Sequence, residues 1–195
     1  MPRSSVLVML PLDGHVHTQF SWDAPSGDMH ATCSRAVAIG LPALAFTEHV
    51  DLTPWALHGG RRLPQHYRGQ VSADGLFLGA PLDVAAYLME VDRCRHAFPD
   101  LLILSGIELS EGHWHPGPVA ALLAAFDLNR VVGSVHALVD LQANPTRSAH
   151  VEVGDGYFQR QPIDVVLAYL DEVRAMAASD APFEVLGHID YPLRF

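Results

Sequence analysis

The sequence predicts an α/β protein in which a parallel sheet curls into a barrel with helices on its outside. Segments with the apolar pattern of buried strands alternate with segments of helical periodicity, which is typical of repeated βα units. Five strand-like segments end in residues that bind metals, and active sites of parallel barrels lie at the carboxyl ends of the strands. The 195 residues are 49% hydrophobic, enough for the core of a single domain over residues 1–195.

The first three elements are expected before residue 50. A strand over residues 6–17 is predicted because this segment opens with the apolar run 6–12. A helix over residues 28–40 follows, and Gly40 ends it because glycine readily adopts the left-handed conformation that closes helices. Residues 41–49, rich in side chains of the buried type, form the second strand.

The middle of the chain begins with a long loop over residues 50–79, in which Gly, Pro, His and Arg are scattered. Loops of this length in a compact domain usually cover or line a site. Pro81 is expected to open a helix over residues 82–98, and residues 101–109 form the third strand. The apolar face of the helix is formed by residues at helical spacing: Val84, Tyr87, Leu88, Val91 and Cys94.

The last part of the chain repeats the same alternation. A short helix rich in Ala and Leu is predicted over residues 118–126, followed by the fourth strand over residues 130–138. After an irregular loop over residues 142–161, an amphipathic helix covers residues 162–178. The fifth strand, residues 183–190, has no helix after it.

The composition excludes several classes of protein. The formal net charge of −10 argues against a nucleic-acid backbone as the main partner. All 12 basic residues are Arg, so a Walker A phosphate loop, a Schiff-base lysine and a carbamylated-lysine metal bridge are excluded.

Cys33 and Cys94 are too few for a disulfide framework and fall in predicted helices, so we expect buried free thiols. No apolar run could cross a bilayer and the N-terminus lacks a signal-peptide layout, so we expect no membrane partner and a cytoplasmic location.

The most informative motif is Asp-Gly-His-Val-His at residues 13–17, where the first apolar run ends. His15 and His17 are two residues apart in an extended segment, so both imidazoles point to the same side. Two neutral imidazoles held this close chelate a transition metal. The later apolar runs end in residues of the same kind, and together they predict one metal centre at the mouth of the barrel: Glu48, His49, Glu108, His136, His188 and Asp190.

These motifs resemble those of the polymerase and histidinol phosphatase (PHP) superfamily, and within it the histidinol-phosphatase type. The family opens with Asp-x-His-x-His-Thr followed by Ser-x-Asp, and its second motif is Thr-Asp/Glu-His. The resemblance runs in order through nearly the whole chain, over residues 13–18, 21–23, 47–49, 82–108, 133–136 and 187–190.

The resemblance implies a distorted (β/α)7 barrel, of which this chain holds about five βα units, around two or three divalent metals. Because the ligands are mainly imidazoles with a bridging carboxylate, we expect Zn, Mn or Fe. Glu108 would bridge two metals, and Glu108 and Asp190 are the candidate catalytic carboxylates. The ligands carried over by position are His15, His17, Asp23, His49, Glu108, His136 and His188.

The implied activity is metal-dependent hydrolysis of a phosphomonoester, with a metal-activated hydroxide as the nucleophile. The resemblance indicates L-histidinol phosphate as the small-molecule substrate, a reaction of histidine biosynthesis. Two alternatives are a PHP phosphoesterase that acts on nucleotides or other phosphoesters, and an inactive fragment that binds metal or a partner chain. The loops 50–79 and 142–161 would line the pocket.

Several acidic residues have a second interpretation. Asp23 could cap the following helix instead of binding metal. Asp13, Glu48 and Asp190 are expected to orient the imidazoles from behind rather than to bind metal directly.

The basic residues of the loops also have two interpretations. Arg61, Arg62 and Arg194 are candidate phosphate contacts, although the pair Arg61 and Arg62 could equally be solvated loop charge. The remaining loop histidines are expected to be solvated surface residues: His58, His66, His113, His115 and His150.

The chain departs from the family at its end. Family members continue with two more strands and a Gly-Ser-Asp-Ala/Ser-His motif, whereas this sequence stops at Phe195. We expect a C-terminally truncated piece of a longer enzyme; another chain that closes the barrel, or a shortened fold, are the alternatives. An open sheet edge at the fifth strand would favour self-association.

Overall fold

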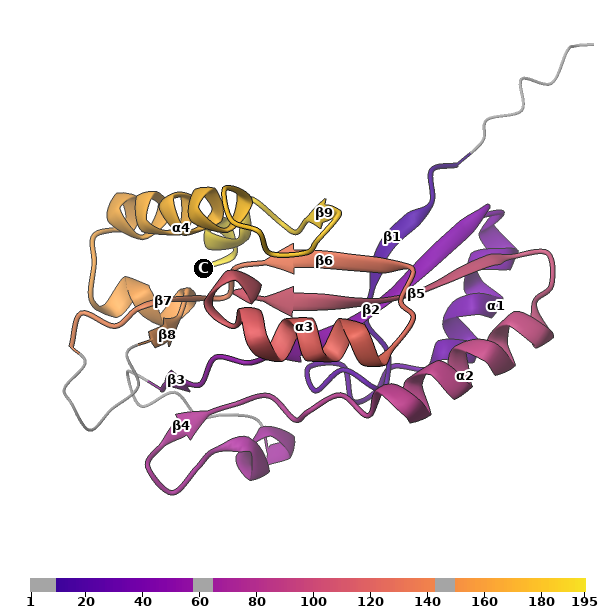
Figure 1. The fold of residues 1–195 in the computed structure, drawn as a ribbon, viewed down its shortest axis with the longest axis horizontal. Helices are drawn as coiled ribbons and strands as arrows, with labels where there is room; N and C mark the ends of the chain where they lie inside the picture. Colours follow the sequence, from indigo (N-terminus) through magenta and orange to yellow (C-terminus); the bar gives the residue numbers. More distant parts are fainter. Residues whose placement is uncertain (1–9, 58–64, 143–149) are drawn as a thin grey trace, which may run out of the picture.

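A computed structural model describes residues 10–57, 65–142 and 150–195 of the chain. Five parallel strands form a curled sheet in the order β1 (Asp13–Val16), β2 (Ala43–Asp51), β5 (Leu102–Ser110), β6 (Arg130–Ser134) and β9 (Val185–Leu186) (Figure 1). A smaller sheet beyond the carboxyl ends of β5 and β6 has the order β4 (Leu76–Phe77), β3 (Trp55–Ala56), β8 (His150–Glu152) and β7 (Ala137–Val139). The predicted α/β class with a curled parallel sheet is confirmed.

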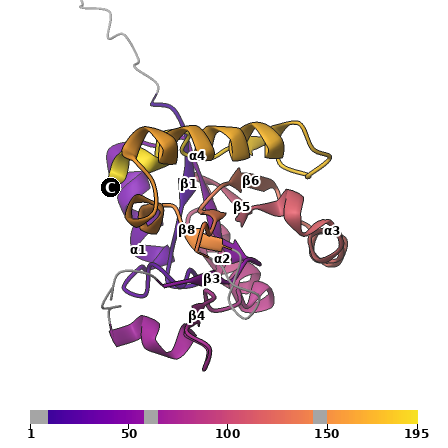
Figure 2. The same ribbon diagram turned by 90° about the vertical axis from the view of Figure 1, so that its left-hand side faces the viewer.

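The described ranges contain four α-helices, α1 (Met29–Ile39), α2 (Val84–Ala97), α3 (Pro116–Ala125) and α4 (Pro162–Ala177), which lie on different sides of the strands (Figure 2). The described ranges also contain four short 3-10 helices: η1 (Gln65–Gln70), η2 (Gly112–Trp114), η3 (Gly154–Phe158) and η4 (Tyr191–Arg194). All four predicted α-helices are present.

The helix ends follow from local side-chain chemistry. The Asp28 carboxylate accepts a hydrogen bond from the backbone N–H of Ala31 at 2.7 Å and so caps α1, which ends at Gly40 with a φ of 77°. Helix α2 begins after Asp83, whose carboxylate accepts from the backbone N–H of Ala86 at 3.0 Å. The prediction that Pro81 opens this helix is therefore wrong, because Asp83 supplies the cap.

Two predicted strands are shorter than expected because the strands that they pair with are short at that end of the sheet. The strand predicted over residues 6–17 is reduced to β1, since β2 begins only at Ala43 and leaves residues 10–12 without a partner; residues 6–9 lie outside the described part. The strand predicted over residues 183–190 is reduced to β9, because its partner β6 ends at Ser134.

The strand predicted over residues 130–138 is interrupted. Strand β6 ends at Ser134 and β7 begins at Ala137, in the other sheet. The backbone N–H groups of His136 and Ala137 both donate to the carboxylate of Glu111, so they are not available to a neighbouring strand. The break therefore passes the chain from one sheet to the next.

The two predicted loops contribute to the smaller sheet. Strands β3 and β4 and helix η1 lie within residues 50–79, and β8 and η3 lie within residues 142–161. Each of these strands has only two or three residues, too short for an alternating pattern to be recognised.

Buried apolar side chains fill the space between helices and sheets. Helices α1 and α2 pack against β2 and β5 through a cluster that includes Met29, Leu44, Phe46, Tyr87 and Val91. A second cluster lies under α4, around Val135, Val165 and Tyr169. The predicted buried free thiols are confirmed: Cys33 and Cys94 both lie in the first cluster, and burial raises the pKa of Cys33 to about 12.

Tyr87 ties α2 to the strands that carry the site. Its buried hydroxyl faces the carbonyl oxygens of Phe46 at 2.9 Å and Gly106 at 3.1 Å, and it accepts a hydrogen bond from the Gly106 N–H at 2.8 Å. We expect Tyr87→Phe to lower the free energy of unfolding by about 1–3 kcal/mol, because these backbone groups lose their partner inside the core. Urea unfolding measures the change. The exposed Met89 of the same helix provides the control Met89→Leu, and equal midpoints for the two variants would contradict the prediction.

Apolar side chains remain exposed around the last strand. Strand β9 is the edge of the parallel sheet, and Leu186, Ile189 and Leu193 beside it are exposed. Among the described residues, no helix has the length and apolar character needed to span a membrane.

Candidate metal centre

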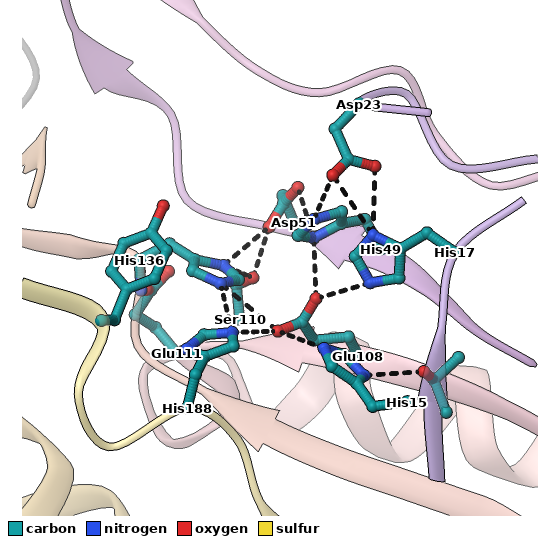
Figure 3. Close-up of polar contacts among 12 residues, drawn as sticks. His15, His17, Asp23, His49, Asp51, Glu108, Ser110, Glu111, His136 and His188 are labelled. Atoms are coloured by element: carbon teal, nitrogen blue, oxygen red, sulfur yellow. Dashed lines mark hydrogen bonds and ion pairs between the residues drawn. The ribbon is translucent and has the colours of Figure 1, made fainter. Parts of the chain in front are cut away.

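The seven predicted metal ligands lie together where the carboxyl ends of the parallel strands meet (Figure 3). Each strand of the curled sheet contributes at least one of them. They are His15 in β1, His17 and Asp23 in the segment after it, His49 in β2, Glu108 in β5, His136 after β6 and His188 after β9.

One oxygen of Glu108 faces three imidazoles. The side chain of Glu108 is only 1% exposed, and its Oε1 lies 2.7 Å from Nε2 of His188. The same oxygen lies 3.3 Å from Nε2 of His136 and 3.5 Å from Nε2 of His15. These contacts bring β1, β5, β6 and β9 to a common point.

The other oxygen of Glu108 faces two further imidazoles. Glu108 Oε2 lies 3.0 Å from Nε2 of His17 and 3.4 Å from Nδ1 of His49. Asp23 lies on the far side of both rings, 3.1 Å from Nδ1 of His17 and 3.5 Å from Nε2 of His49. Because Asp28 caps α1, the alternative that Asp23 is a helix cap is wrong.

The geometry fits divalent metal ions. Two ligands of a tetrahedral zinc, each about 2.0–2.1 Å from the ion, lie about 3.3 Å apart, close to most of the separations around Glu108. His17 Nε2, His49 Nδ1 and Glu108 Oε2 are buried and face one another as ion pairs without forming a hydrogen bond, so a metal ion between them would satisfy all three. Three overlapping donor groups could each hold an ion: His15, Glu108 and His188; His17, His49 and Glu108; and His49, Asp51 and His136.

The electrostatics of the centre are those of a carboxylate among imidazoles. Burial raises the pKa of Glu108, but His136, His17 and His188 hold it well below its usual range. Burial lowers the pKa of His136, but Glu108 and Asp51 outweigh burial and raise it to about 10. For His17, Asp23 and Glu108 likewise outweigh burial and raise the pKa to about 9.

We expect metal binding at pH 7 to release protons, because His17 and His136 are protonated in the metal-free protein and must be neutral to bind a metal. The affinity should therefore fall as the pH is lowered. Calorimetric titration with Zn²⁺ in two buffers of different ionisation enthalpy measures the number of protons released. His136→Ala should lower that number, and a count of zero in the parent protein would contradict the prediction.

Two hydroxyl side chains orient ligand rings. The Thr47 hydroxyl lies 2.8 Å from Nδ1 of His15, and the Ser110 hydroxyl lies 2.7 Å from Nδ1 of His136. Hydrogen bonds at Nδ1 leave Nε2 facing Glu108, the arrangement usual for metal-binding histidines.

The residues predicted for this orienting role act elsewhere. Asp13 is exposed and faces the backbone N–H of His15 at 3.5 Å rather than its ring. Glu48 is buried and accepts hydrogen bonds from the backbone and hydroxyl of Thr18, so it fixes the loop after β1. Both predictions are wrong because each carboxylate finds a closer partner in the backbone near β1.

Asp190 is exposed, precedes η4 and is not among the residues that line the cavity. Strand β9 ends at Leu186, so the alternation that would place His188 and Asp190 on one side does not hold. Arg194 does line the cavity, whereas Arg61 and Arg62 lie outside the described residues.

Asp51 is the main residue that the sequence analysis missed. Its side chain is 1% exposed and accepts hydrogen bonds from the Trp22 indole and the Ser110 hydroxyl. Its Oδ2 lies 3.5 Å from Nδ1 of His49, and its Oδ1 lies 3.8 Å from Nδ1 of His136. Because residues 47, 49 and 51 of a strand point to the same side, the period of two could have identified it.

Glu111 is a second missed residue. It has a φ of 45°, the only positive φ outside glycine in the described part of the chain. Its buried carboxylate accepts from the backbone N–H groups of His136 at 2.5 Å and Ala137 at 2.8 Å, and burial raises its pKa to about 7. Glu111 thus holds the chain at the point where His136 enters the centre.

Three loop histidines predicted to be solvated are held by other side chains. His113 is 8% exposed and lies 2.6 Å from the carboxylate of Glu172, because η2 packs against α4. His115 Nε2 lies 2.8 Å from the Thr53 hydroxyl, and His150 stacks on Trp114 with ring centroids 4.5 Å apart. His58 and the side chain of His66 lie outside the described part.

The centre opens into a cavity of about 450 Å³, a volume suited to a small molecule. On one side the cavity is lined by four aromatic side chains, here called the aromatic wall: Trp22, Trp55, Tyr67 and Phe77. On another side it is lined by Glu152, Tyr191 and Arg194.

The fold and the site together define an α/β protein of the parallel-barrel class with a candidate metal centre at its strand ends. The model of the PHP domain family matches residues 13–195, and the chain belongs to this family. The resemblance inferred from the motifs is thereby confirmed.

The chain is 24% identical over 192 residues to the histidinol-phosphatase of Lactococcus lactis subsp. lactis (strain IL1403), covering 96% of this chain and 59% of that relative. A crystal structure of histidinol phosphate phosphatase from the same organism, complexed with Zn, L-histidinol and phosphate, covers 94% of this chain and 59% of its own, with a TM-score of 0.62 and 24% identity. The structure of a putative histidinol phosphatase from Listeria monocytogenes has a TM-score of 0.70 at 18% identity, covering 94% of this chain and 68% of its own. These similarities support the fold, and the chain spans 59% of the length of the curated relative.

Proposed function

We propose that the protein is a metal-dependent phosphomonoester hydrolase of the histidinol-phosphatase type, which converts L-histidinol phosphate to L-histidinol and phosphate. The observation that carries the proposal is Glu108, whose two oxygens face five imidazoles at separations suited to bridged metal ions. Membership of the PHP family supports it, as does the zinc, L-histidinol and phosphate complex of the similar protein from Lactococcus lactis.

In this proposal the seven predicted ligands, with Asp51, hold two or three Zn, Mn or Fe ions. When bound, the ions supply positive charge that activates water and neutralises the phosphoryl oxygens. Glu108 holds the two halves of the centre together, and Thr47 and Ser110 fix the rings of His15 and His136. Arg194 would contact the phosphate, and the catalytic role of Asp190 and the phosphate contacts of Arg61 and Arg62 stay predictions.

Phosphate release tests the proposal directly. The purified protein, loaded with Mn²⁺ or Zn²⁺, is assayed with L-histidinol phosphate, AMP and glycerol phosphate, before and after a chelator. We expect turnover of L-histidinol phosphate that disappears with chelator and returns with metal. Faster release from AMP would favour the nucleotide phosphoesterase, and metal binding without any turnover would favour the inactive fragment.

His136→Ala is expected to lower the metal content of the purified protein, because it removes a buried imidazole beside Glu108 and Asp51. Elemental analysis gives the metal bound per chain before and after the substitution. His113→Ala is the matched control, since His113 is also a buried histidine but pairs with Glu172 away from the centre. A folded parent protein that binds no Zn²⁺ or Mn²⁺ when the ion is supplied, or equal losses in both variants, would contradict the site assignment.

We also propose that residues 1–195 act as one domain and that copies associate through the exposed apolar edge at β9. Leu186, Ile189 and Leu193 beside this edge support the association. Sedimentation at several protein concentrations tests it, and a monomer at every concentration would contradict it. The cytoplasmic location stays a prediction.

A further inference from the structure

The aromatic wall is assembled from segments that are separate in the sequence. Trp22 follows β1, Trp55 lies in β3, Tyr67 in η1 and Phe77 in β4. The ring of Phe77 lies 5.0 Å from those of both Trp22 and Trp55, and the rings of Trp22 and Tyr67 are 5.4 Å apart. Such edge-to-face and tilted contacts make the rings support one another as a rigid apolar surface.

The aromatic wall is continuous with the candidate metal centre. The ring of Trp22 lies 5.2 Å from the ring of His49, and its indole N–H donates to Asp51. All four rings line the same cavity as Glu108. A phosphate ester whose phosphoryl group lies at the centre would therefore place its organic part against this wall.

The chemistry of the wall selects the kind of organic group. None of the four side chains carries a charge, and their rings offer flat apolar faces and edges suited to another planar ring. A short aliphatic group would leave much of this surface without contact. Trp22 and Tyr67 supply most of the exposed surface of the wall, and the almost fully buried Trp55 and Phe77 pack behind them, so the surface is fixed before a ligand arrives.

We propose that the aromatic wall binds a planar ring in the organic part of the substrate, and so selects ring-bearing phosphate esters over ring-free ones. The proposal rests on the proposed function, for which the ring is the imidazole of L-histidinol phosphate. Tyr67 and Trp55 are the positions to vary, because the Trp22 side chain contacts the side chains of Asp51 and His49 in the centre. The Tyr67 hydroxyl donates to the backbone carbonyl of Asp23 at 3.2 Å, and Tyr67→Phe removes that bond while keeping the ring.

A binding experiment needs no catalysis. In a Trp114→Phe background, the remaining tryptophans are Trp22 and Trp55, both in the wall, and their fluorescence reports binding there. We expect L-histidinol to change this fluorescence and L-valinol, an amino alcohol without a ring, to leave it unchanged. Tyr67→Leu should weaken L-histidinol binding about tenfold, whereas Tyr67→Phe, which keeps the ring, should bind like the parent. Equal responses to both alcohols would overturn the proposal.

Turnover separates the subsite from the function. In the metal-loaded protein, Tyr67→Leu and Trp55→Leu should raise KM for L-histidinol phosphate about tenfold and leave glycerol phosphate unchanged. Phe158→Leu is the control, because Phe158 is exposed and outside the wall. Equal losses with both substrates would overturn the subsite and leave the phosphatase function standing. Turnover of AMP but not of L-histidinol phosphate, with a KM raised by Tyr67→Leu, would overturn the histidinol assignment and support the ring subsite.

Discussion

Replacing Glu108 with Gln is expected to lower phosphate release from L-histidinol phosphate by about a hundredfold to a thousandfold. The two side chains have nearly the same shape, so the change removes a charge rather than volume. The amide would turn a donor group toward imidazoles that now face carboxylate oxygens at 2.7–3.5 Å. Each oxygen of Glu108 faces a different set of imidazoles, so the Gln amide would break the link between the two halves of the centre. The loss of a single stabilising group usually costs about 10²–10³ in rate.

Metal content and folding are measured alongside turnover for Glu108→Gln. We expect less metal per chain and an unchanged far-UV circular dichroism spectrum, since the fold does not depend on this charge alone. Glu90→Gln makes the same chemical change in α2, where Glu90 pairs with Arg93 on the surface, and should leave all three quantities unchanged. A Glu108→Gln protein that kept its metal and its turnover would show that the centre lies elsewhere.

The candidate ligands could be found from the sequence because parallel strands bring their carboxyl ends to one edge. His15, His49 and Glu108 lie in long or clearly marked strands, and His136 and His188 follow the next two strands in the sheet. Their spatial gathering thus follows from the βα alternation, without any knowledge of side-chain positions.

The support around the ligands could not be predicted in the same way. Thr47, Ser110 and Glu111 act through hydrogen bonds to residues of neighbouring strands, and such pairings depend on register. The aromatic wall depends on the two-residue strands β3 and β4, which have no recognisable period. The position of Asp190 outside the cavity lining could not be predicted because the strand expected over residues 183–190 ends at Leu186, where its partner β6 also ends.

Two partly buried histidines outside the centre show the limit of composition arguments. His113 and His115 follow β5 in a segment that the sequence predicts to be a solvated loop. In the structure His113 contacts Glu172 and His115 contacts Thr53, both from distant segments. The packing of η2 against α4 brings Glu172 to His113, and the chain after β2 brings Thr53 to His115.

Glu111→Ala is expected to lower the free energy of unfolding by about 2–5 kcal/mol, because it leaves two backbone N–H groups buried without an acceptor. These groups belong to His136 and Ala137, so the bend that carries His136 into the centre should loosen as well. We therefore expect a weaker affinity for Zn²⁺ in addition to the lower stability. Urea unfolding of the metal-free protein and competition with a zinc chelator measure the two effects separately.

Glu111→Gln separates the hydrogen bonds from the charge. The pKa of Glu111, raised to about 7 by burial, means that a neutral side chain is tolerated at this position near neutral pH. Gln keeps an acceptor for the N–H groups of His136 and Ala137, so it should recover much of the stability and zinc affinity lost in Glu111→Ala. The other oxygen of Glu111 has no hydrogen bond, so the Gln amide placed there would lack a partner and the recovery should be incomplete. If Gln were as damaging as Ala, the charge rather than the two hydrogen bonds would hold His136 in place.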